Sequence, residues 1–347
     1  MKIVADDKIP FIQGKLETIA DEVIYKPGAQ ITPSDVRNAD ALIVRTRTKC
    51  NKQLLDGSTV RFIATATIGY DHLDIDYLKF KGIEWANCPG CNATSVAQYI
   101  YSCLLLLEKE KGLQLHGTNV GLIGAGHVGT AVKKAVTPLG VQVLLNDPPL
   151  AERLARSSKP HDEYLPIDVL QQTCDILSFH TPLTYNCPHA TFHLADAAFF
   201  SQLKKRPWLI NTSRGEVIST ESLLNAMKSG LVRGAVIDTW ENEPNINPEL
   251  LRLAFIATPH IAGYSADGKA NAARMALSAL CKFFHICKEF DIRPPELHLD
   301  AACKDLSEKE QALLLYNPRR DSDALKKRPE QFEHLRENYP LRREKFE

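Results

Sequence analysis

The sequence predicts an α/β protein with parallel sheets, because short apolar runs alternate with helix-like segments along most of the chain. Runs that are apolar throughout are typical of strands buried on both faces of a sheet. Right-handed crossovers would join those in the second part of the chain into one doubly wound parallel sheet. Six such runs follow residue 118, at 119–124, 141–147, 175–181, 208–213, 234–239 and 255–260.

A second, smaller α/β domain is predicted ahead of this sheet, from a series of shorter runs at 2–6, 23–26, 41–46, 61–67 and 83–89. A long helix over residues 92–111, ended by Gly112, would join the two domains. Another helix, over about 266–290, would return toward the first domain. The longest strongly apolar stretch, 96–107, is much shorter than the roughly 20 residues of a membrane-spanning helix, so we expect a buried helix there.

Composition narrows the class of protein. The chain has 347 residues, 44% hydrophobic and 24% charged, which suits two or three globular domains. Lys plus Arg and Asp plus Glu are 42 each, and this balance counts against a general nucleic-acid binder. The N-terminal residues lack the apolar core of a secretory signal, and nine irregularly spaced cysteines fit a reducing compartment. We therefore expect a cytoplasmic protein with no nucleic-acid or membrane partner.

Cys88 and Cys91 form a single CxxC sequence, Cys88-Pro89-Gly90-Cys91. Such a pair can be a redox centre or half of a zinc site, but no second CxxC or close histidine pair supplies the other ligands. A tight turn after a strand is the favoured interpretation, and no metal is expected.

The final 47 residues are unusually rich in charge, with 11 Lys or Arg and 10 Asp or Glu. Charge content alone would make this tail a solvated appendage. Its apolar residues nevertheless need burial, so docking on a partner subunit is an equal alternative. These apolar residues are Leu313, Leu314, Leu315, Tyr316, Phe332, Leu335, Tyr339 and Leu341.

Residues 124–129 form a GxGxxG loop, placed between the first strand of the larger sheet and a helical run. Gly124 would permit the tight turn, Gly126 would let the backbone approach a pyrophosphate, and Gly129 would let helix and strand pack closely. The free N–H groups at the start of the helix would bind the phosphates. The strand, loop and helix together predict a dinucleotide site that includes His127 and Val128, with the His127 side chain facing solvent rather than acting in catalysis.

Asp147 closes the second strand of this sheet. A carboxylate there accepts hydrogen bonds from ribose hydroxyls and repels a 2′-phosphate, which favours NAD over NADP. The alternative is a turn aspartate, because Pro148 and Pro149 follow it directly.

Three ionisable residues, Arg214, Glu243 and His260, follow the last three strands. Singly, each could be a surface ion pair or a capping group. Together at one edge of one sheet they suit the oxidation of a 2-hydroxy acid: the guanidinium holds the substrate carboxylate, and a neutral imidazole takes the hydroxyl proton. Glu243 beside His260 would stabilise the imidazolium and raise the histidine pKa above about 6.5.

The segments 124–129, 211–215, 238–244 and 259–263 resemble the D-isomer-specific 2-hydroxy-acid dehydrogenases. The resemblance places that family's catalytic Arg, Glu and His at Arg214, Glu243 and His260. It also implies that NAD contacts Asp147, Thr181, Asp238 and Gly263. The implied fold has a flavodoxin-like substrate domain at 1–94 with a returning helix at about 265–288, a Rossmann NAD-binding domain at 95–264, and a C-terminal dimerisation segment at 289–347.

One branch of that family is resembled more closely, through residues 64–74, 89–93, 260–265, 319–321 and 335–344. Members of this branch are homodimers that oxidise 4-phospho-D-erythronate in vitamin B6 synthesis. The resemblance implies substrate contacts from Thr46, Thr67 and Tyr264, although Thr46 stands where serine is expected and Tyr264 could instead be a packed aromatic residue. Arg45 or Arg47 could add charge for the phosphate.

Two alternatives remain at the level of sequence. The first is a dehydrogenase for another phosphorylated hydroxy acid such as 3-phosphoglycerate, because the three catalytic residues do not measure the length of a substrate. The second, less favoured, is an NAD-sensing scaffold without turnover. For the enzyme, we expect the substrate in a cleft between the two α/β domains.

Overall fold

The computed structural model describes residues 1–298, 305–340 and 342–345, so Leu341 of the tail lies outside the described residues. The chain divides into two compact units. The first unit comprises Met1–Asn92 and Ser265–Leu297, and the second comprises Ala93–Tyr264 and the described part of His298–Glu347.

The first unit contains a five-stranded parallel sheet with the order β2-β1-β3-β4-β5, which is the flavodoxin-like order. Its strands lie where the sequence predicts them: β1 (Lys2–Asp6), β2 (Glu22–Lys26), β3 (Ala41–Val44), β4 (Phe62–Thr65) and β5 (Glu84–Ala86). Short helical segments connect them, namely η1 (Leu16–Thr18), η2 (Gly28–Gln30), α1 (Pro33–Val36), α2 (Lys52–Leu55) and α3 (Ile75–Lys81).

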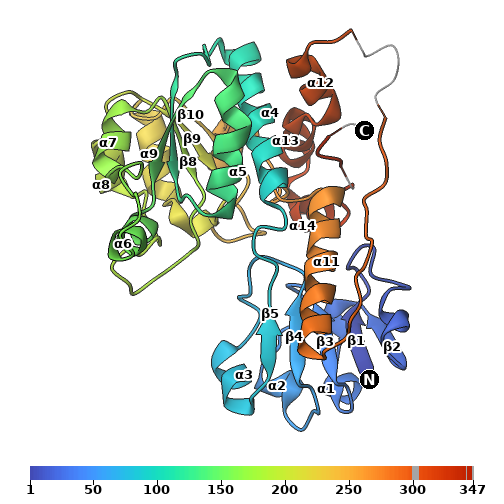
Figure 1. Ribbon diagram of the computed structural model, residues 1–347. Coiled ribbons are helices and arrows are strands. Elements are labelled where there is room, and N and C mark those ends of the chain that lie inside the picture. Colours follow the sequence, from blue (N-terminus) through green and yellow to red (C-terminus); the bar gives the residue numbers. More distant parts are fainter. Residues whose placement is uncertain (299–304, 341, 346–347) are drawn as a thin grey trace. The chain divides into compact units, whose positions relative to one another are not determined.

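Helix α11 (Ala266–Phe283) packs along this sheet (Figure 1), with the Phe283 ring stacked on Phe62 at a centroid distance of 4.9 Å. The helix ends earlier than the predicted residue 290. His285 adopts a left-handed backbone, φ 53°, and the Ile286 N–H donates to the Cys281 carbonyl at 2.8 Å. This hydrogen bond is that of a Schellman ending, which the apolar pattern does not reveal.

The second unit contains a six-stranded parallel sheet with the order β11-β10-β9-β8-β6-β7. All six strands lie within the predicted runs: β6 (Asn119–Ile123), β7 (Gln142–Asn146), β8 (Ile176–Phe179), β9 (Trp208–Asn211), β10 (Gly234–Ile237) and β11 (Ile256–Ala257). The strand order reverses between β6 and β8, which is where a doubly wound sheet binds its ligand. The predicted fold class is therefore confirmed.

Helices cover both faces of this sheet (Figure 1). On one face lie α4 (Ala93–Lys111) and α5 (His127–Val136), and on the other lie α7 (Ile167–Thr173), α8 (Ala197–Ser201) and α9 (Thr220–Lys228). The remaining segments are η3 (Thr137–Leu139), α6 (Pro148–Arg156), η4 (Gly215–Val217) and α10 (Pro248–Leu253).

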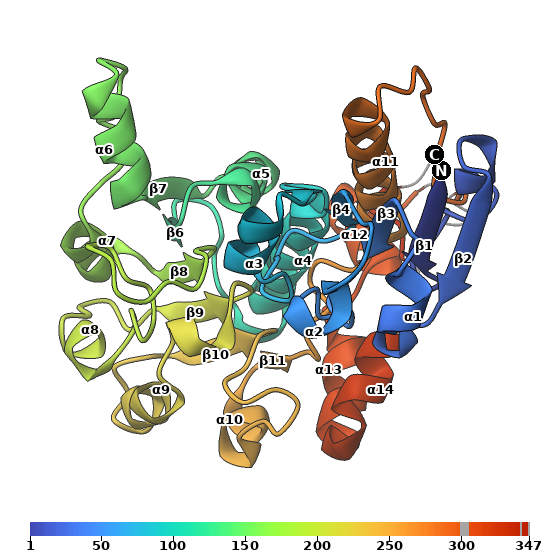
Figure 2. The same ribbon diagram turned by 90° about the horizontal axis from the view of Figure 1, so that it is seen from below.

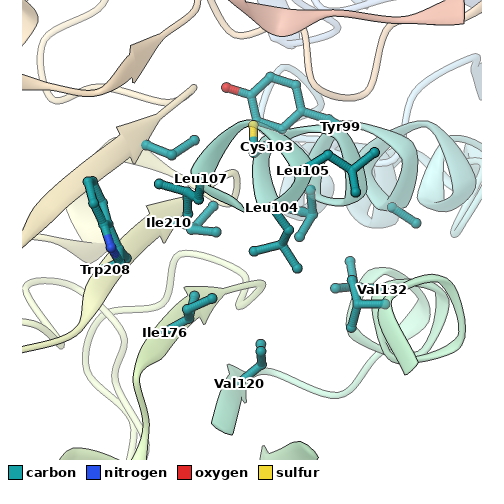
Figure 3. Packing of buried hydrophobic residues seen from close by; sticks show 14 of the residues in the cluster. Tyr99, Cys103, Leu104, Leu105, Leu107, Val120, Val132, Ile176, Trp208 and Ile210 are labelled. Atoms are coloured by element: carbon teal, nitrogen blue, oxygen red, sulfur yellow. The ribbon is translucent and has the colours of Figure 1, made fainter. Parts of the chain in front are cut away.

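Helix α4 is the apolar helix that the sequence predicts to be buried. Leu104 and Leu107 of this helix face strand residues such as Val120, Ile176 and Ile210 (Figure 3). Apolar residues on several sides of α4 are buried, which explains why its sequence is apolar almost throughout. Among the described residues, no helix is long and apolar enough to span a membrane.

The C-terminal tail packs on the second unit. It forms α12 (Glu308–Leu315), α13 (Pro318–Lys327), η6 (Pro329–Gln331) and α14 (Phe332–Glu337), and α13 and α14 lie side by side (Figure 2). The tail residues Tyr316, Leu325 and Phe332 are buried in the core of this unit. The described part of the tail therefore buries several of its apolar residues within its own chain.

Helix α13 also covers the edge of the six-stranded sheet that is formed by β11. The Ser322 hydroxyl accepts a hydrogen bond from the Ala257 N–H at 3.0 Å, and Arg319 Nη1 donates to the Phe255 carbonyl at 2.7 Å. Ala257 belongs to strand β11, and Phe255 directly precedes it. The tail thus satisfies backbone groups that an edge strand would otherwise leave open to pairing.

Candidate active site

The GxGxxG loop joins β6 to α5, and its three glycines meet different surroundings. Gly124 has φ +96°, and a Cβ atom there would lie 2.7 Å from the His180 carbonyl carbon. A Cβ atom at Gly129 would lie 2.1 Å from the Gly124 carbonyl oxygen, whereas one at Gly126 would meet nothing within 4 Å. The turn itself requires the first and third glycines, and the open side of Gly126 leaves room for a phosphate at the backbone.

Thr181 follows β8, on the other side of the point where the strand order reverses. Its Oγ1 atom is buried and has no hydrogen-bond partner among the described residues. Buried hydroxyls are nearly always paired, so this one is suited to bind a ligand that enters the site. The open Gly126 and the unpaired Thr181 hydroxyl together fit a bound dinucleotide.

Asp147 lies at the end of β7 with both carboxylate oxygens in use. One accepts a hydrogen bond from the Ala125 N–H and the other from the Leu150 N–H, each at 2.9 Å. Asp147 is thus the N-cap of α6 and also a support of the glycine loop. Each oxygen keeps a further lone pair, so the predicted ribose contact is compatible with the cap. The His127 side chain is exposed, and Val128 packs partly against the core.

His260 and Glu243 form a hydrogen-bonded pair at the carboxyl edge of the sheet. His260 Nδ1 lies 2.9 Å from Glu243 Oε2, and Oε1 of the same carboxylate accepts a hydrogen bond from the Trp240 N–H at 2.9 Å. Burial alone would raise the pKa of Glu243, but the hydrogen bond and charge of His260, the Trp240 N–H and the Arg336 guanidinium outweigh it and lower that pKa. An ionised carboxylate only accepts hydrogen bonds, so Nδ1 carries the proton and Nε2 of neutral His260 is the basic atom.

The backbone of His260 is left-handed, with φ 57°, a conformation that a non-glycine residue keeps only when its surroundings enforce it. Asp238 supplies this constraint. Its buried carboxylate accepts hydrogen bonds from the N–H groups of Ile261 at 2.8 Å and Ala262 at 3.0 Å, and from the Thr258 hydroxyl at 2.6 Å. Burial raises the pKa of Asp238 although these donors favour its charged form. The expected contact of Asp238 with NAD stays a prediction.

Arg214 follows β9. This strand is the neighbour of β10, which precedes Glu243. Arg214 Nη1 donates to the Ser213 carbonyl at 2.9 Å, and the Asn211 side-chain amide donates to the Arg214 carbonyl at 2.9 Å. A Cβ atom at Gly215 would lie 1.9 Å from the Trp240 carbonyl carbon, so this loop packs directly on the turn that leads to Glu243. Arg214, Glu243 and His260 therefore follow the neighbouring strands β9, β10 and β11.

The remaining predicted residues belong to different units. Tyr264 lies in the second unit, edge-to-face with Tyr339 at a centroid distance of 6.2 Å. Thr46 and Thr67 lie in the first unit, where Thr46 is exposed and the Thr67 hydroxyl donates to the Gly69 carbonyl at 2.8 Å. Gly263 directly precedes Tyr264 in the second unit.

The two arginines that flank Thr46 differ. Arg45 Nε donates to the fully buried carboxylate of Asp6 at 3.1 Å, so its charge balances a buried charge of the same unit. Arg47 is exposed.

The sequence does not point to Arg336 as a residue of this site. Arg336 lies on α14, and its Nη1 atom is 3.6 Å from Glu243 Oε2. The segment that contains it, 335–344, contributes to the family resemblance, but neither spacing nor composition connects a tail arginine to a glutamate so far away in the sequence.

Cys88 and Cys91 are free, buried thiols. Burial raises the pKa of each to about 12, which makes either a poor nucleophile at neutral pH. Within the part of the chain that the structure describes, no group of three His, Cys, Asp or Glu side chains could hold a metal ion. The favoured interpretation of this CxxC as a turn agrees with this environment.

A doubly wound sheet, a glycine loop at its switch point and a His–Glu pair at its carboxyl edge define the class of NAD-dependent dehydrogenases. Residues 105–262 match the family model described as "D-isomer specific 2-hydroxyacid dehydrogenase, NAD binding domain". The chain belongs to the D-isomer-specific 2-hydroxyacid dehydrogenases, and its cofactor is NAD.

Within the family, the chain is similar to proteins named erythronate-4-phosphate dehydrogenase. It is 52% identical to that of Bacteroides fragilis over 99% of this chain and 97% of the relative, and 44% identical to that of Porphyromonas gingivalis over 99% and 94%. A crystal structure of D-lactate dehydrogenase from Aquifex aeolicus, complexed with NAD and lactic acid, has the same fold. It matches with a TM-score of 0.67 at 24% identity and covers 85% of this chain and 100% of that one.

Proposed function

We propose that this protein oxidises 4-phospho-D-erythronate to 2-oxo-3-hydroxy-4-phosphobutanoate with NAD, as a step of pyridoxine 5′-phosphate (vitamin B6) synthesis. The observation that carries the chemistry is the 2.9 Å hydrogen bond between His260 and Glu243 at the carboxyl edge of the NAD-binding sheet. The name of the 52% identical relative, erythronate-4-phosphate dehydrogenase, supports the choice of substrate.

His260 is the acid/base residue of the proposed reaction. Its Nε2 atom takes the proton of the C2 hydroxyl as the C2–H and O–H bonds break and the C2 carbonyl forms. The chemistry that NAD would supply when bound is acceptance of the hydride from C2. Glu243, whose pKa is lowered, stays ionised and stabilises the imidazolium that forms.

Arg214 holds the substrate carboxylate in this proposal, because a guanidinium can donate two parallel hydrogen bonds to it. Its loop packs on Trp240, so the position of the carboxylate is linked to the turn that bears Glu243. Holding the carboxylate fixes C2 relative to His260.

The phosphate end of the substrate needs hydroxyl and cationic partners. Thr46, Thr67 and Tyr264 supply hydroxyls, and Arg45 or Arg47 supplies charge. The affinities of Arg45→Gln and Arg47→Gln for a phosphorylated acid, each compared with wild type, identify the arginine that supplies this charge.

The protein acts as a cytoplasmic homodimer in this proposal, with the tail as its contact segment. Leu314 of α12 keeps 42% of its surface exposed, which leaves apolar area for a second copy. Light scattering of the purified chain tests this: the mass of two chains supports the dimer and the mass of one chain contradicts it.

The proposed activity is tested by reduction of NAD with 4-phospho-D-erythronate, with 3-phosphoglycerate, glycerate and lactate in parallel and with the 2-oxo product trapped. A strong preference for 4-phospho-D-erythronate is expected. Turnover with 3-phosphoglycerate instead would keep the mechanism and replace the substrate. Bound NAD without any turnover would favour a non-enzymatic NAD sensor.

A further inference from the structure

The carboxylate of Glu243 has two cationic neighbours, and one of them comes from the tail. Its Oε2 atom lies 2.9 Å from His260 Nδ1 and 3.6 Å from Arg336 Nη1. The Arg336 side chain is only 29% exposed, and its buried Nε has no hydrogen-bond partner among the described residues. Interaction with Tyr264, which we assign to substrate binding, helps to raise the pKa of this guanidinium. Arg336 thus joins the acid/base pair to a substrate residue.

We infer that Arg336 is a positioning residue of the proposed reaction. It shares the Glu243 carboxylate with His260, and its charge favours the neutral imidazole that accepts the proton. This inference rests on the proposed function of His260 as the base. It adds a role for the tail in the chemistry, beyond folding and assembly.

The charges around His260 show why such a cation is needed. Glu243, on the turn after β10, and Asp238, at the end of β10, both stabilise a positive charge on the imidazole. The other ionisable residues at this edge of the sheet are Tyr264, after β11, and Arg214, after β9. Carboxylates beside an imidazole favour the imidazolium, which cannot take the hydroxyl proton. Arg336, from α14, supplies the opposing charge.

The helix that carries Arg336 is held in place independently of the ion pair. Phe332, at the first position of α14, is buried in the core of the second unit, with 1% of its surface exposed. An arginine remains charged at every accessible pH, so it acts as a constant source of charge that does not titrate with the histidine.

The test compares the pH dependence of kcat/KM in wild type, Arg336→Gln and Arg336→Met. Without the guanidinium, the pKa of His260 should rise. We expect the acidic limb for hydroxy-acid oxidation and the alkaline limb for 2-oxo-acid reduction to move upward together, by on the order of one pH unit. Arg336→Lys should restore most of the wild-type profile, and Arg328→Gln, at an exposed arginine of the same tail, should leave it unchanged.

NMR titration of the His260 imidazole, identified by its absence in His260→Gln, measures the same shift without turnover. An unchanged His260 titration in folded Arg336→Gln and Arg336→Met would overturn the inference. So would loss of the native circular dichroism spectrum in both variants, because Arg336 would then be structural. Wild type without activity on 4-phospho-D-erythronate would instead count against the proposed function, and the NMR result would still decide the effect of Arg336 on the pair.

Discussion

The guanidinium of Arg342 donates a hydrogen bond of 2.6 Å to the carbonyl of Ala262, two residues after His260. It donates another to the Ile261 carbonyl at 2.9 Å. The N–H groups of the same two residues bind Asp238, so the segment after His260 is fixed through both its donors and its acceptors. The tail therefore contributes to the geometry of the site as well as to the core.

Replacing Arg342 should destabilise the protein. Arg342→Met removes a buried cation and leaves the carbonyls of Ser95, Ile261 and Ala262 without this donor. We expect the free energy of unfolding to fall by on the order of 3 kcal/mol, because unsatisfied buried acceptors are costly. Urea unfolding measures this, with Arg320→Met at an exposed arginine of α13 as the control. Equal unfolding midpoints for the two variants would show that the hydrogen bonds of Arg342 contribute nothing to stability.

Two glycines of the cofactor loop should respond differently to alanine. Gly126→Ala adds a methyl group where nothing lies within 4 Å, so the protein should keep its melting temperature but bind NAD at least roughly tenfold more weakly. Gly129→Ala forces a contact of 2.1 Å with the Gly124 carbonyl oxygen, so it should lower the melting temperature as well. Calorimetric NAD titration and thermal unfolding separate the effects. Normal NAD affinity in Gly126→Ala would place the phosphates elsewhere.

Asp147 should determine the preference for NAD over NADP. Asp147→Ser keeps a good N-cap for α6 but removes the charge that repels a 2′-phosphate. We expect the ratio of kcat/KM for NAD to that for NADP to fall by about tenfold or more. If the ratio stays the same while the variant is folded, Asp147 is only a cap and a loop support.

Glu243 should make stability depend on pH in the acidic range. Burial raises the pKa of Glu243, but its contacts with His260, the Trp240 N–H and Arg336 outweigh burial and lower that pKa in the folded protein. Folding therefore favours the ionised form of Glu243. The resulting stabilisation is complete above the unfolded pKa of about 4.3 and is lost as the pH falls through the lower folded value. The difference in unfolding free energy between wild type and Glu243→Gln should shrink over that range. A difference that is constant with pH would contradict an ionised, paired Glu243.

Much of the fold could be predicted because parallel strands have a simple pattern. The apolar runs predicted all six strands of the second unit, and each run ends at the same sheet edge. His260 and Glu243 could be brought together for this reason, since they follow the adjacent strands β11 and β10. The glycine spacing predicted the loop because Gly124 and Gly129 have no room for a Cβ atom and Gly126 leaves room for a phosphate at the backbone.

Contacts of the tail could not be predicted in the same way. Tyr316 and Phe332 show that an apolar residue must be buried, but the pattern does not say against which surface. Arg336 and Arg342 reach the site from irregular or short helical segments far along the sequence, where no periodicity sets their direction. The left-handed backbone of His260 likewise depends on Asp238 and has no local signal.

The most direct test of the account is the fate of the hydrogen at C2 of the substrate. 4-Phospho-D-erythronate deuterated at C2 would be incubated with NAD and either wild type or His260→Ala, and the reduced cofactor and its rate of formation would be measured by mass spectrometry. We predict that wild type transfers the deuterium to the nicotinamide, and that His260→Ala binds NAD normally but turns over roughly 10²- to 10⁴-fold more slowly. Release of the deuterium to water, or undiminished turnover in the variant, would contradict a hydride transfer that depends on His260.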